Sequence, residues 1–227
     1  MAGLYVVATP IGNLGDITVR AVEVLRSCHT VACEDTRHSR KLLAHLGVSK
    51  PTLPCHGRNL ERCLPRILDI LREGADVAYV SDAGTPGVSD PGSSLVRSVR
   101  DAGYPVTPIP GASAVTALLS VSGIAGRGWY FEGFLPPKGN KRRTRLTELL
   151  DRGDPVVLYE SPHRIARLME DLRTVAPGVE VLLGRELTKI YEQIVRGTVE
   201  EIAHMVDNTT IPARGEFVVV VWIGKTR

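Results

Sequence analysis

The stretch with the most chemical potential in this chain is SDAGTPGVSDPG, residues 81–92. It carries Asp82 and Asp90 among glycines and prolines and contains no lysine or arginine. Glycines let a backbone approach a ligand closely, and prolines fix the path of a loop without donating hydrogen bonds. Two carboxylates with no basic residue beside them would repel a polyphosphate. They can instead accept hydrogen bonds from ribose hydroxyls or an amine, pair with a cationic centre, or remove a proton. A solvated turn with two aspartate caps is the simpler alternative.

The segments around this stretch predict that it lies at the end of a strand. An apolar run at residues 77–80 precedes it, and an amphipathic run at residues 95–102, typical of a helix, follows it. From residue 4 to about residue 114, strand-like and helix-like segments alternate, which predicts a mostly parallel sheet with helices on both faces. In such α/β folds, ligands usually bind beyond the carboxyl ends of the strands.

The second half of the chain has a different pattern. Residues 120–128 are rich in glycine and small residues, which indicates a hinge between two α/β domains at residues 1–118 and 119–227. The expected strands at 181–184 and 193–197 have no long helix between them, so the second sheet is predicted to be mixed.

Composition narrows the class of protein. A hydrophobic content of 43% and a charged content of 23% are ordinary for a soluble protein, and a net charge of +3 does not by itself indicate nucleic-acid binding. No apolar run approaches the ~18 residues of a membrane span, and no signal peptide is expected at the N-terminus. The four cysteines fit neither a disulfide framework nor a metal site, so we expect reduced thiols in a cytoplasmic protein; they are Cys28, Cys33, Cys55 and Cys63.

Charged residues also cluster at other predicted strand ends. Glu34-Asp35-Thr36-Arg37 follows the second strand, where a helix cap is the alternative interpretation. Residues 160–164 and 185–189 each place several charges where loops gather around a site. The tract 138–145 holds five basic residues and no acid, which is the best nucleic-acid signal here, although a solvated helix start explains it too.

Taken together, these stretches resemble the bacterial ribosomal RNA small-subunit methyltransferase I family. The resemblance rests on the opening LYVVATPIGNL, on EDTR, SDAGTPGVSDPG, GFLP, YESPHR and RELTK, in that order along nearly the whole chain. It implies the tetrapyrrole-methylase fold, with S-adenosylmethionine in a cleft between two α/β domains and pairing as a homodimer. It also implies transfer of a methyl group to the ribose 2′-hydroxyl of a cytidine in 16S rRNA of the small ribosomal subunit.

The resemblance places the loop of residues 81–92 at the cofactor, and the chemistry of methyl transfer to a hydroxyl then suggests roles for particular residues. Asp90 is the first candidate for the catalytic base, and Glu34 and Glu186 follow it. The cofactor would lie among Pro10, Asp82, Ala83, Gly84, Ser113, Ala114 and Leu135. Phosphates of the RNA would be held by Arg37, Arg164, Arg185 and Lys189 and by the basic tract, that is by Lys138, Lys141, Arg142, Arg143 and Arg145.

Two other functions stay open from the sequence. The same fold could methylate a tetrapyrrole or another non-RNA substrate, or the chain could bind RNA without catalysis. The first loop disfavours a porphyrin-like ring, because tetrapyrrole-modifying relatives normally carry G-x-G-x-G-D where this chain has Thr9-Pro10-Ile11-Gly12-Asn13. The same loop lacks the G-x-G-x-x-G spacing of a Rossmann dehydrogenase.

Overall fold

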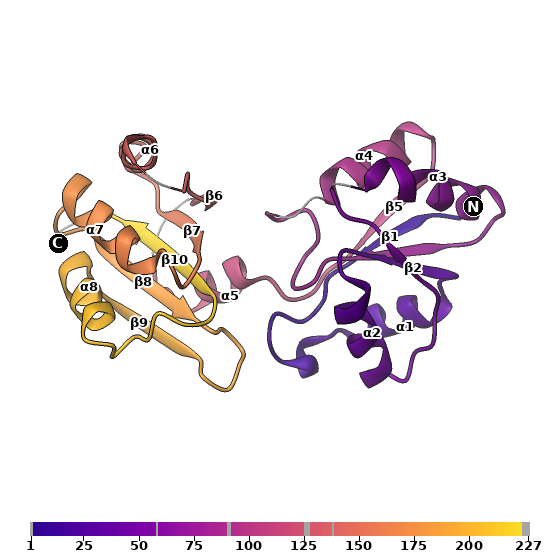
Figure 1. The fold of residues 1–227 in the computed structure, drawn as a ribbon, viewed down its shortest axis with the longest axis horizontal. Coiled ribbons are helices and arrows are strands. Elements are labelled where there is room, and N and C mark those ends of the chain that lie inside the picture. The colour runs from indigo at the N-terminus through magenta and orange to yellow at the C-terminus, as the bar shows by residue number, and fades with distance from the viewer. Residues whose placement is uncertain (1, 58, 90–91, 125–127, 138, 224–227) are drawn as a thin grey trace. The chain divides into compact units, whose positions relative to one another are not determined.

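The computed structural model describes residues 2–57, 59–89, 92–124, 128–137 and 139–223. The chain divides into two compact units, Met1–Ser113 and Ala114–Arg227. This division lies just before helix α5 (Ala114–Ser120), whereas the boundary expected after residue 118 falls inside that helix. Each unit contains its own five-stranded sheet and its own helices (Figure 1).

The first unit is built on a wholly parallel sheet, which confirms the fold predicted for this half. Its strands are β1 (Leu4–Val7), β2 (Thr30–Cys33), β3 (Thr52–Pro54), β4 (Val77–Val80) and β5 (Val106–Ile109). They lie in the order β3-β2-β4-β1-β5. Strands β2 and β4 are buried along their whole length because helices cover both faces of the sheet, and this explains their continuous apolar sequences.

Two pairs of helices cover this sheet. Helices α1 (Val19–Ser27) and α2 (Thr36–His45) lie on one face, and α3 (Leu60–Arg72) and α4 (Gly92–Asp101) lie on the other (Figure 1). Each pair closes a separate hydrophobic core against the sheet. Since each helix follows a strand of a parallel sheet, every helix begins near the carboxyl edge of the sheet, where the connecting loops gather.

The second unit contains the mixed sheet that the sequence predicts. Its strands are β6 (Tyr130–Phe134), β7 (Val156–Glu160), β8 (Glu180–Arg185), β9 (Gln193–Thr198) and β10 (Phe217–Trp222), in the order β6-β7-β10-β8-β9. Strands β6 and β7 are parallel, and the other neighbours are antiparallel. Helices α6 (Asn140–Leu150), α7 (Ile165–Val175) and α8 (Val199–Asp207) close its main core.

The state of the cysteines corrects one expectation. Cys55 and Cys63 form a disulfide between the loop after β3 and helix α3, whereas reduced thiols were expected throughout. The sequence could not show this pairing because the turn between the two residues, and not their spacing, brings the sulfur atoms together. Cys28 and Cys33 are free and buried, and burial raises the pKa of both thiols. Among the described residues, no helix is long and apolar enough to cross a membrane.

Candidate active site

The loops after β1, β2, β4 and β5 form the candidate site of the first unit. Parallel strands end at the same edge of a sheet, and β4 lies between β1 and β2 in the strand order. The loop of residues 81–92 follows β4. Its described part therefore lies between the loop after β1, which starts at Ala8, and the loop after β2, which starts at Glu34. The expectation of a loop at a strand end is therefore confirmed.

Backbone pairing holds the β4 loop against its neighbours. Thr9 and Gly84 form an isolated antiparallel bridge, in which each backbone N–H donates to the carbonyl oxygen of the other at 2.9 and 3.1 Å. The Thr85 hydroxyl donates to the carbonyl oxygen of Ala112 at 3.1 Å, which ties the same loop to the one after β5. Three loops are thus fixed by hydrogen bonds whose donors and acceptors are mostly backbone atoms.

Glycine is required at Gly84 for two reasons. Its φ angle is +77°, a conformation that side chains with a Cβ rarely adopt. A Cβ at this position would also lie 3.3 Å from the Ile11 side chain and 3.7 Å from the carbonyl oxygen of Ala112. A larger residue would therefore be strained by its backbone conformation and would also press on the Ile11 side chain.

Asp82 links the β4 loop to the loop after β2. Its Oδ1 accepts a hydrogen bond from the backbone N–H of Asp35 at 3.1 Å. Asp35 in turn caps helix α2 by accepting from the N–H of Arg37 at 2.8 Å, and it also pairs with the Arg37 guanidinium at 2.9 Å. The side-chain hydrogen bond from Arg37 lowers the pKa of Asp35 to about 2, so this carboxylate stays ionised. Arg37 is exposed, but Asp35 offsets its charge.

The cofactor residues expected from the sequence fall into both units. Pro10, Asp82, Ala83, Gly84 and Ser113 lie on the loops at the carboxyl edge of the first sheet. Ala114 begins α5, and the buried Leu135 directly follows β6; both belong to the second unit. Asp82 keeps a carboxylate oxygen that accepts no hydrogen bond from the described residues, so it is available to an amino group or a hydroxyl of a ligand.

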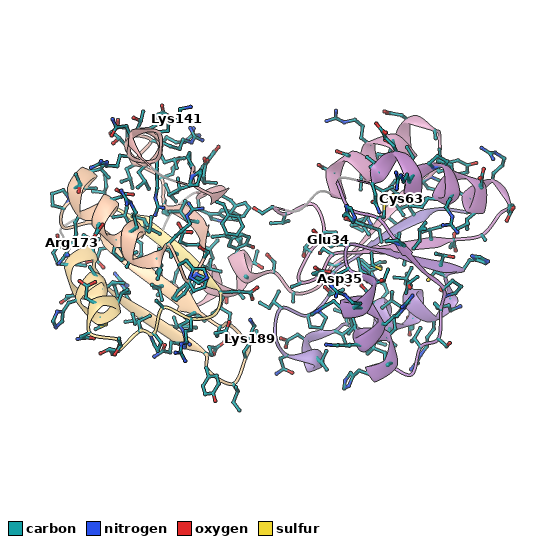
Figure 2. All side chains as sticks on the ribbon, in the orientation of Figure 1. Glu34, Asp35, Cys63, Lys141, Arg173 and Lys189 are labelled. Carbon is teal, nitrogen blue, oxygen red and sulfur yellow. A yellow bond between two sulfur atoms is a disulfide. The ribbon has the colours of Figure 1, made fainter. Side chains whose placement is uncertain are left out.

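The three candidate bases have different surroundings. Glu34 follows β2 and is half-buried beside Asp35 at the carboxyl edge (Figure 2). Asp90, the first candidate, lies outside the described residues. Glu186 directly follows β8 in the second unit, so it belongs to a different group of loops from Glu34.

Glu186 is already engaged in hydrogen bonds. Its Oε1 accepts from the Lys189 ammonium at 2.8 Å and from the backbone N–H of Glu216 at 2.9 Å. A Cβ on Gly215 would meet the Glu186 side chain at 2.5 Å, so glycine is required where the chain passes this carboxylate. Burial alone would raise the pKa of Glu186, but the hydrogen bonds from Lys189 and Glu216 outweigh it and lower the pKa. A carboxylate held this way is a weak proton acceptor.

The environment of Arg142 does not fit the expected contact with RNA phosphates. Its side chain has no exposed surface, and it lies 3.3 Å from Glu160 Oε2 and 3.1 Å from Asp171 Oδ2. Burial lowers the pKa of Arg142, and the two carboxylates oppose that shift. Glu160 ends β7 and Asp171 lies on α7, so Arg142 joins α6 to two other elements. In this structure it is a core ion pair and is not available to a ligand.

The other members of the basic tract are only partly available. Arg145 is bound by Glu132 at 2.7 Å and Glu148 at 3.0 Å, and both hydrogen bonds raise its pKa. Arg143 is 41% exposed and lies 3.8 Å from Asp171. Lys141 is exposed on the outer side of α6 (Figure 2). Lys138 lies outside the described residues.

The remaining arginines that were expected to hold phosphate bind backbone carbonyls instead. Arg164 donates to the carbonyl oxygens of Leu135 and Pro136 at 2.9 and 3.2 Å and pairs with Glu160. Arg185 is buried and donates to the carbonyl oxygens of Arg214 and Tyr191. These side chains hold the loops at residues 135–136 and 186–192 in place.

Sequence reasoning missed two parts of this arrangement. The acids that neutralise Arg142 come from β7 and α7, so no local pattern shows them. The arginines of α3 were also overlooked, although Arg62 and Arg66 are spaced one helical turn apart and that spacing is visible in the sequence.

Comparison with known proteins identifies the family. The family model of tetrapyrrole (corrin/porphyrin) methylases matches residues 3–203. The ribosomal RNA small subunit methyltransferase I of Xylella fastidiosa is 47% identical over 96% of this chain and 80% of its own length. The proteins of that name from Leptospira biflexa and Borrelia garinii are 46% and 44% identical, over 88% and 97% of their own lengths.

Two solved structures share the fold of this chain. A cobalt-precorrin-4 methyltransferase of cobalamin biosynthesis has a TM-score of 0.72 at 20% identity and covers 96% of this chain and 94% of its own. A uroporphyrin-III C-methyltransferase from Thermus thermophilus has a TM-score of 0.67 at 21% identity, covering 98% and 94%. At that identity they show the fold alone, and the resemblance seen in the sequence is confirmed by the curated relatives. The chain therefore belongs to the tetrapyrrole methylase family, in the group of the ribosomal RNA small subunit methyltransferase I proteins.

Proposed function

We propose that this protein transfers a methyl group from S-adenosylmethionine to the ribose 2′-hydroxyl of a cytidine in 16S rRNA. The observation that carries the proposal is the set of relatives named ribosomal RNA small subunit methyltransferase I, which share 43–48% identity over at least 95% of this chain. A ribosomal substrate implies action in the cytoplasm. By the same resemblance, the working form is a homodimer, and the substrate is either the RNA or the small subunit.

The loops at the carboxyl edge of the first sheet supply what the methyl donor needs. Gly84 exposes no side chain of its own on this loop, and Asp82 offers a carboxylate oxygen to an amine or a ribose hydroxyl. Once bound, the donor supplies an electrophilic methyl group on a sulfonium sulfur. The hydrogen bonds among Thr9, Gly84, Thr85 and Ala112 hold these loops in one arrangement before any ligand arrives.

The reaction requires the hydroxyl oxygen within about 3–3.5 Å of the methyl carbon and in line with the bond that breaks. A ribose hydroxyl is a weak nucleophile, and a carboxylate that accepts its proton contributes roughly 10²–10⁴-fold. We assign this role to Asp90, with Glu34 as the next candidate. Glu186 ranks last, because Lys189 and the N–H of Glu216 already occupy its Oε1.

A methylation assay with labelled S-adenosylmethionine tests the proposal. We expect label in 16S rRNA when naked RNA and small subunits are offered, and mapping of the product should place it on one ribose. The second candidate is a tetrapyrrole methylase, which the description of the matching family model favours. Label in a uroporphyrinogen-type ring but not in RNA would establish that alternative. Failure to bind S-adenosylmethionine in a calorimetric titration would leave only an RNA-binding protein.

A further inference from the structure

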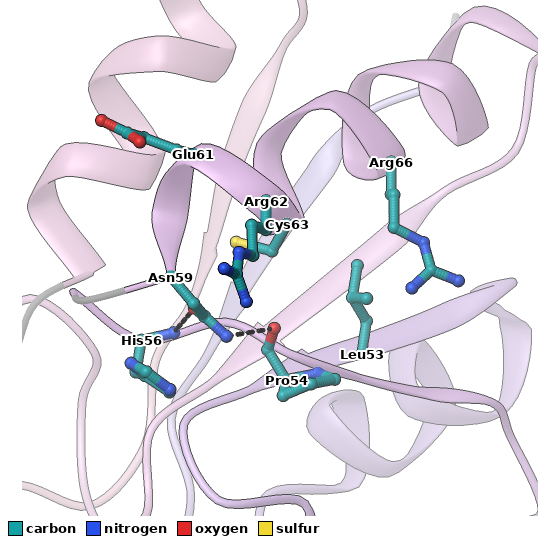
Figure 3. Close-up of a pocket in the computed structure, with 8 residues that line it drawn as sticks. All are labelled: Leu53, Pro54, His56, Asn59, Glu61, Arg62, Cys63 and Arg66. Carbon is teal, nitrogen blue, oxygen red and sulfur yellow. Dashed lines mark hydrogen bonds between the residues drawn. The ribbon is translucent and has the colours of Figure 1, made fainter.

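The first unit contains a pocket of about 630 Å³ between β3 and α3, and the function proposed above does not use it (Figure 3). Leu53 and Pro54 come from the strand, His56 and Asn59 from the loop after it, and four residues from the helix, namely Glu61, Arg62, Cys63 and Arg66. Strand β3 is next to β2, and the backbone N–H of Cys55 donates to the carbonyl oxygen of Cys33 at 2.7 Å. The pocket therefore adjoins the strand end that carries Glu34.

Its walls carry positive charge. Arg62 and Arg66 lie one turn apart on α3, and both are exposed. Within the described parts of the chain, neither guanidinium has an ion pair or a side-chain hydrogen bond. Glu61 is the acid among the lining residues, and its carboxylate points away from the other labelled side chains (Figure 3). The pocket thus presents two arginines with the histidine ring of His56.

The frame around these arginines is fixed. Asn59 accepts a hydrogen bond from the backbone N–H of His56 at 2.7 Å and donates one to the carbonyl oxygen of Pro54 at 3.1 Å (Figure 3). The disulfide of Cys55 and Cys63 joins the same loop to the helix. A pocket whose loop is held by its own side chains keeps its shape without a ligand, which lowers the entropic cost of binding.

The residues at the β3 edge of the sheet favour a polyanionic ligand over an added protein strand. Strand β3 is at the edge of the sheet, but Pro51 and Pro54 have no N–H to donate to an added strand. On the other face of the sheet, Arg40 of α2 donates its Nε to the Thr52 hydroxyl at 3.2 Å, so Arg40 does not line this pocket. Planar guanidinium groups match the paired oxygens of a phosphodiester.

We propose that this pocket binds the phosphodiester backbone of the RNA substrate beside the target nucleotide, with Arg62 and Arg66 as its phosphate contacts. The inference rests on the proposed function, since it assigns a further part of the surface to the same substrate. It also gives the RNA a cationic contact on the first unit, where Arg37 is paired with Asp35.

The test compares the double variant Arg62→Ala/Arg66→Ala with the wild type in binding to a 16S rRNA fragment across a range of salt concentrations. Each phosphate contact to single-stranded RNA contributes about 0.7 to the log–log salt slope, so we expect the slope to become shallower by roughly 1.4. The KM for RNA should rise while kcat and the affinity for S-adenosylmethionine stay unchanged.

A matched control removes two arginines from the same unit that lie at the C-terminal ends of their helices, away from the carboxyl ends of the strands. Arg72 and Arg100 are in the last turns of α3 and α4, so Arg72→Ala/Arg100→Ala changes the net charge equally without touching the pocket. An equal change of slope in both double variants, or none in the pocket variant, would overturn the inference.

If the proposed function is wrong, the experiments give a result that differs from failure of the pocket inference. In that case the wild type does not methylate 16S rRNA or small subunits, and the pocket is tested with an oligouridylate instead. Weaker oligouridylate binding by the pocket variant than by the control supports an RNA site there. Equal binding by the two variants rejects the site.

Discussion

At the scale of single residues, the candidate site depends on backbone geometry as much as on side chains. Thr9 and Gly84 pair through their main chains, and the side chain of Asp82 is bound to a backbone N–H. The φ of +77° at Gly84 disfavours any side chain there, so substitution of this glycine is a direct test of where the methyl donor binds.

We predict that Gly84→Val abolishes S-adenosylmethionine binding. The new side chain would meet Ile11 and would fill the space beside the loop, and its backbone would be strained at a φ of +77°. Isothermal titration calorimetry measures the loss.

Gly103→Val is the matched control for that variant. Gly103 has a φ of +85°, no atom lies within 4 Å of an added Cβ, and it precedes β5 at the opposite edge of the sheet. It therefore carries similar strain without entering the site. Full affinity in Gly84→Val, or an equal loss in both variants, would argue against a donor site at this loop.

The role of the base is tested by three isosteric substitutions. We predict that Asp90→Asn lowers the methylation rate by at least about tenfold and leaves the binding of S-adenosylmethionine and RNA unchanged, because the carboxylate acts only on the proton. Glu186→Gln should have the smallest effect of the three, since its Oε1 already accepts from Lys189 and Glu216. Single-turnover rates measure the step. A larger loss in Glu34→Gln would move the role of base to Glu34.

At the scale of elements, ion pairs inside the second unit hold helices to the sheet. Arg142 on α6 meets Glu160 at the end of β7 and Asp171 on α7. Arg164 pairs with the same Glu160 and binds the carbonyl oxygens of the segment after β6. A loop that carries Leu135, expected at the cofactor, is therefore positioned by a charged cluster and not by its own sequence.

We predict that Arg142→Ala destabilises the protein by about 3–5 kcal/mol. Loss of the guanidinium leaves Glu160 and Asp171 buried without their partner, and breaking a buried pair from one side costs about that much. The exposed neighbour Lys141 gives the control, because Lys141→Ala should change stability by no more than about 0.5 kcal/mol. Urea unfolding monitored by circular dichroism measures both variants. Equal free energies of unfolding for Arg142→Ala and the wild type would mean that the ion pairs of Arg142 make no net contribution to stability.

At the scale of the whole molecule, two units with separate cores form one chain. The first unit closes two cores around a parallel sheet, and the second closes its main core on one face of a mixed sheet. Of the residues that the resemblance assigns to the cofactor, Ser113 ends the first unit and Ala114 begins the second.

We predict that the protein sediments as a dimer at micromolar concentration, with twice the 24.6 kDa mass of the chain. The family resemblance is the basis for this expectation. Sedimentation velocity over a range of dilutions measures the mass, and addition of S-adenosylmethionine should not change it. A single species with the mass of one chain throughout the range would refute the dimer.

The sequence by itself determined the fold and the family. The alternation of apolar and amphipathic runs predicted the parallel sheet, because strands buried on both faces need continuous apolar sequence, as β2 and β4 have. The loop at residues 81–92 was predicted from its glycines, prolines and aspartates, and its position at the end of β4 follows from the strand before it. Local pattern carries this information because period and turn chemistry depend on adjacent residues.

Only the tertiary structure decided which charged residues a ligand can reach. In the sequence Arg142 and Lys141 are adjacent basic residues, but the helix places one against Glu160 and Asp171 and the other in solvent. Cys55 and Cys63 pair because the turn before α3 brings them together, and Arg62 and Arg66 face a pocket because β3 lies beside that helix. Burial and pairing depend on elements that are distant in the chain, so no local pattern contains them.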